Sequence, residues 1–291
     1  MRIHAIHVEP RGEARLGDVL THIESLSLRR RLQTVSGTPM RLESVNRSGR
    51  FWLLDFALIR PNGPGRAASS APIVDFDLNA DEGFGEETAA LYDPRSNYMS
   101  LQYNHFGPRQ ARIEAYLNRF ASALDDDHEE SELGFDLDPV LTADAADRLS
   151  HMQIVKSIEA TIHVPGIAAR PESRRRSLSS LLEVPVVGHA QTVSIQVSAG
   201  RRRHQSLSIP QVRRAISELL GMRDDVRTLS IVAKESEDGP REPIDFLEAR
   251  LEMDIELRAI DRGRRYPLEE RIAVLRQAFD LWREQGHFDH D

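Results

Sequence analysis

Arginine side chains are grouped around one expected connection between a strand and a helix. The strand carries Val193, Ile195 and Val197 in alternation, and the helix opens at Ser208 with an apolar stripe. Guanidinium groups hold phosphates by charge and by forked hydrogen bonds, and the N–H groups of a helix start favour the same anions. The spacing therefore predicts one surface that binds the phosphate backbone of duplex DNA. The residues expected to contact DNA are Arg201, Arg202, Arg203, His204, Arg213 and Arg214, together with Arg174, Arg175 and Arg176 in a preceding polar segment.

Two other functions fit the same sequence. A run of charge is often only a solvated face, and a scaffold protein would use the arginines to bind an acidic partner, including the acidic segments of a second copy. A nuclease would instead use Asp or Glu carboxylates with a divalent ion. Aromatic side chains are nearly absent near the arginines, which favours the backbone of a duplex over stacked single strands.

The formal net charge of −8 conceals an uneven distribution of charge. Residues 165–214 hold nine arginines and two glutamates. By contrast, Asp75–Asp93 holds seven carboxylates and Asp125–Asp138 holds eight, and neither segment contains Lys or Arg. A chain polarised in this way has a local positive field in spite of its overall acidity.

The acidic segment Asp75–Asp93 matches part of a metal-site pattern. Positions of a calcium-loop pattern are occupied by Asp75, Asp77, Asn79, Asp81 and Glu86. Ala80 stands where such a loop needs glycine, and neither flank is predicted to be a helix, so the segment is interpreted as an acidic loop. The sequence has no glycine-rich phosphate loop, HExxH motif or nucleophile elbow. We therefore expect a non-enzymatic protein with no cofactor, no metal and no catalytic residue.

Hydrophobic periodicity predicts an N-terminal α+β domain over residues 1–150. The expected elements are a strand at 1–8, a helix at 16–28, hairpins at 40–59 and 86–103, a helix at 109–124, a strand at 135–141 that returns to the first sheet, and a short helix at 142–149. Residues 61–72 are rich in Pro, Gly and Ser and are expected to form a loop.

A second α+β domain is expected over residues 151–263, with the basic strand-to-helix connection at its centre. Its expected strands cover residues 152–164, 193–197, 228–233 and 247–257, and its helix covers 208–220. The segment 264–291 is expected to form a helix that packs on a domain or on a dimer contact. The fold class is therefore α+β, with two domains that are each a small mixed or antiparallel sheet covered by helices.

The composition favours a cytoplasmic protein. The chain has no cysteine, and its first residues lack the apolar core of a signal peptide. The longest apolar run, Phe51–Ile59, is far shorter than the roughly 18 residues that cross a membrane, and it contains Asp55.

Three segments resemble a diffuse group of prokaryotic and prophage proteins that includes the lambda RexA exclusion protein and, more distantly, the KwaB component of Kiwa antiphage systems. They are GFGEETAALYDPRSNYMSLQYNHFGPRQARIEAYL (83–117), ADRLSHMQIVKSIEATIHVPG (146–166) and SIQVSAGRRRHQSLSIPQVRRAI (194–216). The likeness lies in the order and character of the features. It implies a two-domain, dimeric DNA-binding protein that acts in phage exclusion or defence, with a separately encoded membrane-protein partner. It also places the DNA contacts at Arg201, Arg202, Arg203, Arg213 and Arg214.

Overall fold

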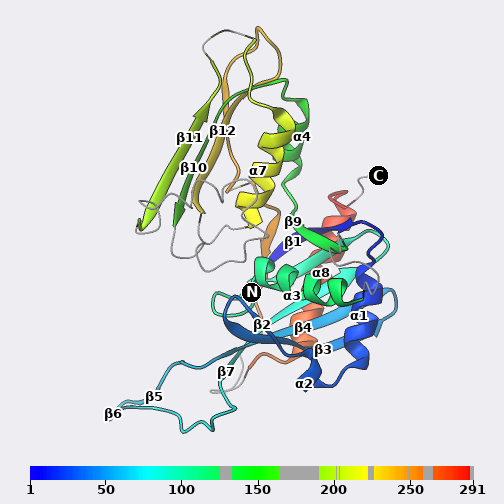
Figure 1. Cartoon of the computed structure of the whole chain (residues 1–291), viewed down its shortest axis with the longest axis vertical. Coiled ribbons are helices and arrows are strands. Elements are labelled where there is room, and N and C mark those ends of the chain that lie inside the picture. Colours follow the sequence, from blue (N-terminus) through cyan, green and yellow to red (C-terminus); the bar gives the residue numbers. More distant parts are fainter. Residues whose placement is uncertain are drawn as a thin grey trace. The chain divides into compact units, whose positions relative to one another are not determined.

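The computed structural model describes residues 1–124, 133–163, 190–200, 202, 204–221, 226–247, 249–257 and 265–288. The chain forms two compact units, and each takes residues from separated segments. The first unit consists of Met1–Ile3, Val8–Asp136 and Met253–Leu281, and the second of His4–His7, Leu137–Glu252 and Trp282–Asp291. The expected domain boundaries at residues 150 and 263 stay predictions. The α+β class is confirmed, because antiparallel sheets are covered by helices (Figure 1).

The larger sheet has eight strands in the order β14-β1-β8-β7-β4-β3-β2, and β9 pairs with β1. These strands are β1 (Arg2–Arg11), β2 (Gln33–Val35), β3 (Thr38–Ser48), β4 (Phe51–Arg60), β7 (Phe84–Asp93), β8 (Tyr98–Gln102), β9 (Gly134–Pro139) and β14 (Glu252–Asp254). Both predicted hairpins are confirmed, as is the return of residues 135–141 to this sheet. Gly49, with a φ of +61°, permits the tight turn between β3 and β4.

Four helices of the described chain follow the predicted apolar stripes, whereas the short helix Leu28–Arg31 was not predicted and has no buried residue. The helices of the described chain are α1 (Leu16–Ser25), α2 (Leu28–Arg31), α3 (Gln110–Ala123), α4 (Ala143–His151), α7 (Ile209–Gly221) and α8 (Leu268–Glu284). Leu275 and Phe279 of α8 are fully buried, as the stripe predicts. No helix of the described residues is long and apolar enough to cross a membrane.

Strand β4 is buried on both faces of the larger sheet. On one face the Phe56 ring meets the ring of Tyr116 on α3 at 6.1 Å, and on the other the Phe51 ring meets the ring of Phe279 on α8 at 5.3 Å. Because side chains alternate along a strand, Asp55 points toward the α8 face, where it is 3% exposed. A carboxylate in such a place requires a cationic or hydrogen-bonding partner.

The smaller sheet has the order β11-β10-β12-β13, and all of its pairings are antiparallel. Its strands are β10 (Ile154–His163), β11 (Thr192–Ser198), β12 (Val226–Lys234) and β13 (Glu242–Asp245). One face packs against α4 and α7 through a core that includes Ala145, Val212, Ile216 and Leu219 (Figure 1). This arrangement places the strand-to-helix connection between β11 and α7 in the second unit.

Two expectations about strands are wrong. Residues 247–257 alternate strictly in sequence, but in the described part of this segment only Glu252–Asp254 is a strand, and Arg250 forms an isolated bridge with Leu141. Arg250 is buried although the alternation predicts it on the wet face, so tertiary contacts override the pattern here. The expected loop at 61–72 contains a short hairpin, β5 (Arg66–Ala68) with β6 (Ala71–Val74).

Candidate nucleic-acid interface and a buried ion-pair network

Several element ends meet at one end of the smaller sheet. Ile154, at the start of β10, lies opposite Lys234, at the end of β12. The segment before α7 runs beside the start of β10. There the Leu207 N–H donates to the Val155 carbonyl at 2.9 Å, and the Val155 N–H donates to Ser206 Oγ at 2.9 Å. The connection that holds the predicted arginines is therefore attached to this end of the sheet.

Lys156 fixes the backbone of the connection. Its side chain is buried, and its Nζ donates to the carbonyl of Arg202 at 2.9 Å and to the carbonyl of Gln205 at 2.5 Å. The Gln205 side chain completes the turn, because its Oε1 accepts a hydrogen bond from the Arg202 N–H at 3.2 Å. The main chain of Arg202 is thus held at both its N–H and its carbonyl.

Cations gather around Lys156. Loss of hydration lowers the pKa of Lys156, repulsion from Arg241 and Lys234 lowers it further, and Glu237 raises it. The strand register agrees, because Lys234 lies opposite Ile154 and Glu242, the neighbour of Arg241, lies opposite Ala233. Lys156, Lys234 and Arg241 therefore share one end of the smaller sheet. The turn after β12 also carries the exposed Glu235, Glu237 and Asp238, so carboxylates share this end of the sheet with the cations.

The structure gives the predicted DNA-binding residues different surroundings. Arg202 and His204 are exposed on the connection, and Arg214 is exposed on the second turn of α7. The expected contacts Arg201, Arg203, Arg174, Arg175 and Arg176 lie outside the described residues. We use the name basic end for Lys156, Lys234 and Arg241 at this end of the sheet, Arg202 and His204 on the connection, and Arg214 on the helix that follows it.

Arg213 has a structural partner. Its Nη2 donates to the carbonyl of Leu149 at 2.9 Å and to the carbonyl of Ser150 at 3.4 Å, at the C-terminal end of α4. The last carbonyls of a helix lack partners within the helix and carry partial negative charge, so a guanidinium there is stabilising. Arg213 therefore connects α7 to the end of α4. The sequence predicted a phosphate contact at this residue and gave no sign of this structural contact.

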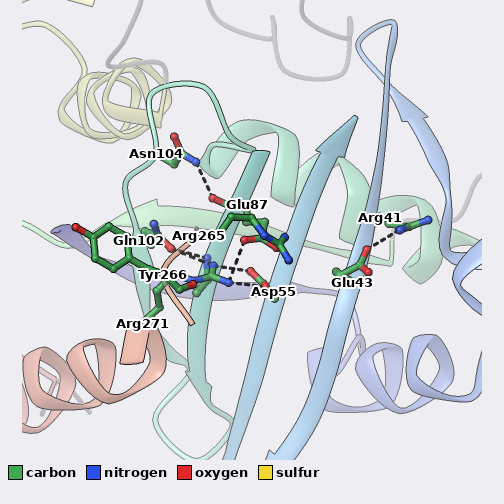
Figure 2. Close-up of polar contacts among 10 residues, drawn as sticks. Arg41, Glu43, Asp55, Glu87, Gln102, Asn104, Arg265, Tyr266 and Arg271 are labelled. Carbon is green, nitrogen blue, oxygen red and sulfur yellow. Dashed lines mark hydrogen bonds and ion pairs between the residues drawn. The ribbon is translucent and has the colours of Figure 1, made fainter. Parts of the chain in front are cut away.

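A second polar group lies in the first unit, between the start of α8 and the strands of the larger sheet (Figure 2). Arg271, on the first turn of α8, forks onto Asp55 of β4: Nη1 donates to Oδ1 at 2.8 Å and Nη2 to Oδ2 at 2.7 Å. Arg271 is 4% exposed and Asp55 3% exposed. The pair joins residues 216 positions apart in the sequence, and it answers the requirement for a partner of Asp55.

Glu87 of β7 extends this network (Figure 2). Its Oε2 lies 3.4 Å from Nη2 of Arg271, and its Oε1 pairs with Nη1 of Arg265. Burial raises the pKa of Glu87, and the charges of Asp55 and Glu43 also raise it, whereas Arg271 and Arg265 lower it. Asp55 and Glu87 thus share the deeply buried guanidinium of Arg271, and Glu87 also pairs with the more exposed Arg265.

The two carboxylates are arranged as in part of a metal site, but the cation that they bind is the side chain of Arg271. Asp55 and Glu87 stand on neighbouring strands of one sheet face, as carboxylates do in sites for divalent ions. Here the guanidinium of Arg271 lies between them. Among the described residues, no group of three or more His, Cys, Asp or Glu side chains is placed to hold a metal ion. The contacts fit a structural role, which is to fasten α8 to the sheet.

The amino-acid sequence alone does not reveal this network. Its one signal was Asp55 inside the apolar run Phe51–Ile59, which requires a buried partner if that run is a strand covered on both faces. Arg271 precedes the buried Ile272 on α8, but helical periodicity alone does not tell a buried arginine from an arginine at the edge of the stripe. Only the three-dimensional pairing reveals which arginine meets Asp55.

Comparison with known proteins gives a family but no activity. The comparison with curated proteins found no match. The likeness to RexA and KwaB stays a prediction. A family model described as a family of unknown function, DUF6731, matches residues 12–279, and the chain therefore belongs to the DUF6731 family.

Proposed function

We propose that this protein binds the phosphate backbone of duplex DNA at the basic end and catalyses no reaction. The observation that carries the proposal is the state of Arg202: its main chain is held by Lys156 and Gln205, whereas its side chain is exposed. A cation on a backbone that is already ordered loses less conformational entropy when it binds an anion.

The surroundings of Arg202 support contacts with several phosphates. Arg214 and Arg241 are also exposed, and Arg214 lies near the start of α7, whose N-terminal N–H groups favour anions. Arginine contacts to phosphate carry no sequence information, so we propose largely sequence-independent binding. If six to ten phosphates are contacted, affinity would fall by roughly three to five decades between low and physiological salt.

Charge reversal tests the proposal with a matched control. The variant Arg202→Glu with Arg214→Glu should lose binding to random-sequence duplex in a fluorescence anisotropy titration, because it replaces attraction by repulsion at the basic end. Arg227→Glu should bind as the wild type does, since Arg227 is an exposed arginine near the start of β12, at the opposite end of the same sheet. Circular dichroism checks that all three proteins are folded.

The outcomes separate the proposal from its rivals. Equal affinity of the wild type and the double charge reversal would overturn the proposal. A scaffold that uses its arginines on an acidic protein would ignore random duplex, whereas a backbone binder is competed off by unrelated DNA and by heparin. Cleavage of the duplex in the presence of Mg²⁺, lost on chelation, would support the nuclease instead.

The proposal includes a role in phage exclusion together with a separately encoded membrane-protein partner. Only the resemblance to RexA-like proteins supports this role and this partner. Expression of the wild type with its neighbouring genes should lower plaque formation. The Arg202→Glu and Arg214→Glu double variant should restore it at equal protein level. If expression of the wild type did not lower the plaque count relative to cells without it, the role in phage exclusion would be contradicted. The proposal of DNA binding would still stand.

A further inference from the structure

Residues 66–82 form an exposed arm on the first unit. Strands β5 and β6 pair as a two-stranded hairpin that extends away from the larger sheet (Figure 1). Every residue of both strands is exposed, and the segment that follows β6 is exposed as far as Glu82. We call residues 66–82 the arm.

The arm carries the pattern of a half-buried strand without the burial. Val74, Phe76 and Leu78 alternate with Asp75 and Asp77, which places apolar side chains on one face of an extended chain and carboxylates on the other. The apolar side chains are nevertheless 44%, 48% and 38% exposed. In the described sheets, β5 and β6 pair only with each other, and the Phe76 ring meets the ring of Phe84 on β7 edge-on at 5.7 Å. Only Val74 of this alternating segment lies in a strand, and its apolar side chains stay partly exposed, which indicates that a partner surface comes from elsewhere.

The second unit presents a strand of complementary character. Among the described strands, β11 is the last one on its side of the smaller sheet. Its alternating apolar residues end at Val197, which is 45% exposed, and the exposed Arg202 and His204 follow. A sheet edge with an exposed apolar residue and nearby cations fits a strand that is apolar on one face and acidic on the other.

We propose that the arm of one copy of this chain pairs with the edge strand β11 of a second copy. Val74, Phe76 and Leu78 would then extend the apolar face of the smaller sheet, and Asp75 and Asp77 would lie near the basic end. Because one chain carries both surfaces, reciprocal exchange of arms between two copies would give a dimer with two identical contacts. The docking does not depend on DNA binding, so each proposal can fail without the other.

Complementation of two defective variants tests the exchange. The arm variant combines Val74→Ser, Phe76→Ser and Leu78→Ser, and the edge variant combines Val197→Asp with Arg202→Glu. We expect each variant alone to be monomeric in analytical ultracentrifugation at concentrations where the wild type is dimeric. An equimolar mixture should form a heterodimer, because the intact arm of the edge variant meets the intact edge of the arm variant. The control Leu28→Ser with Leu32→Ser removes exposed apolar residues elsewhere and should remain dimeric.

Disulfide trapping gives a direct readout, because the chain has no cysteine of its own. A Phe76→Cys chain mixed with a Val197→Cys chain should form a crosslinked heterodimer on a non-reducing gel, and a Leu28→Cys chain in place of the former should not. A monomeric wild type would overturn the proposal, as would a mixture of the two defective variants that stays monomeric. A chain that carries both Phe76→Cys and Val197→Cys gives a further test. If it formed the disulfide only within one chain and never between chains, the arm would pair with β11 of its own chain and the proposal would be overturned.

Discussion

At the scale of single residues, the buried pair of Arg271 and Asp55 has the largest expected effect on stability. Arg271→Met removes the cation and leaves Asp55 buried without its partner, which should cost about 3–5 kcal/mol in the free energy of unfolding. The paired variant Arg271→Met with Asp55→Leu should recover much of that loss, because Asp55 no longer remains buried without its cation and Glu87 keeps its ion pair with Arg265. Urea unfolding measures both values.

An exposed arginine on the same helix provides the control. Arg283→Met should change the free energy of unfolding by less than about 0.5 kcal/mol, because surface charges contribute little. If Arg271→Met were equally mild, the fork onto Asp55 would not hold α8 to the sheet.

Glu87 should make stability depend on pH in a defined direction. Its pKa is raised in the folded state, mainly by burial, so the folded protein binds this proton more tightly than the unfolded chain does. The contribution of Glu87 is then fully favourable below the usual glutamate pKa and is lost as pH rises through the raised pKa. Glu87→Gln removes this dependence. The free energy of unfolding of Glu87→Gln, minus that of the wild type, should therefore rise between pH 4 and pH 7. If urea titrations gave the same difference at both pH values, burial of Glu87 would not control this pH dependence.

At the scale of elements, the two neighbouring arginines of α7 should separate stability from binding. Arg213→Ala removes the hydrogen bonds to the end of α4 and should cost about 1 kcal/mol, with little change in affinity for duplex DNA. Arg214→Ala should leave the urea midpoint unchanged, weaken DNA binding and reduce the dependence on salt by about one phosphate contact. If Arg213→Ala and Arg214→Ala changed stability and DNA affinity by the same amounts, the hydrogen bonds of Arg213 to α4 would not distinguish the two residues.

Elements with a clear period could be predicted from the sequence, whereas pairings between distant elements could not. The stripe of Ile272, Leu275, Phe279 and Trp282 predicted α8 and its buried face. The segment 247–257 had equally clear alternation and still formed only a short strand, because bridging to Leu141 and burial of Arg250 decide its conformation. Within the basic end, the sequence supplied Arg202, His204 and Arg214. The contribution of Lys156 required the fold, since its hydrogen bonds span 46 and 49 positions.

At the scale of the whole molecule, the first unit depends on a helix that comes late in the chain. Ser100 Oγ donates to the Leu275 carbonyl at 3.0 Å, and Phe51 packs on Phe279, so α8 covers one face of the larger sheet. A fragment of residues 1–150 lacks α8 and should bind a hydrophobic dye and unfold without cooperativity. The full chain is the control for the calorimetric scan. Cooperative melting of the fragment at the full-length temperature would contradict this dependence.

This arrangement of the first unit also bears on the order of events during synthesis. The ribosome produces β4, with Phe51 and Asp55, long before it produces α8, and the whole of β10 to β13 emerges in between. Until then one face of the nascent larger sheet is uncovered and Asp55 lacks its cation, whereas the strands of the smaller sheet can already pair. Chaperones that recognise apolar segments have their longest opportunity to bind at this stage, and slow translation before residue 268 would lengthen it.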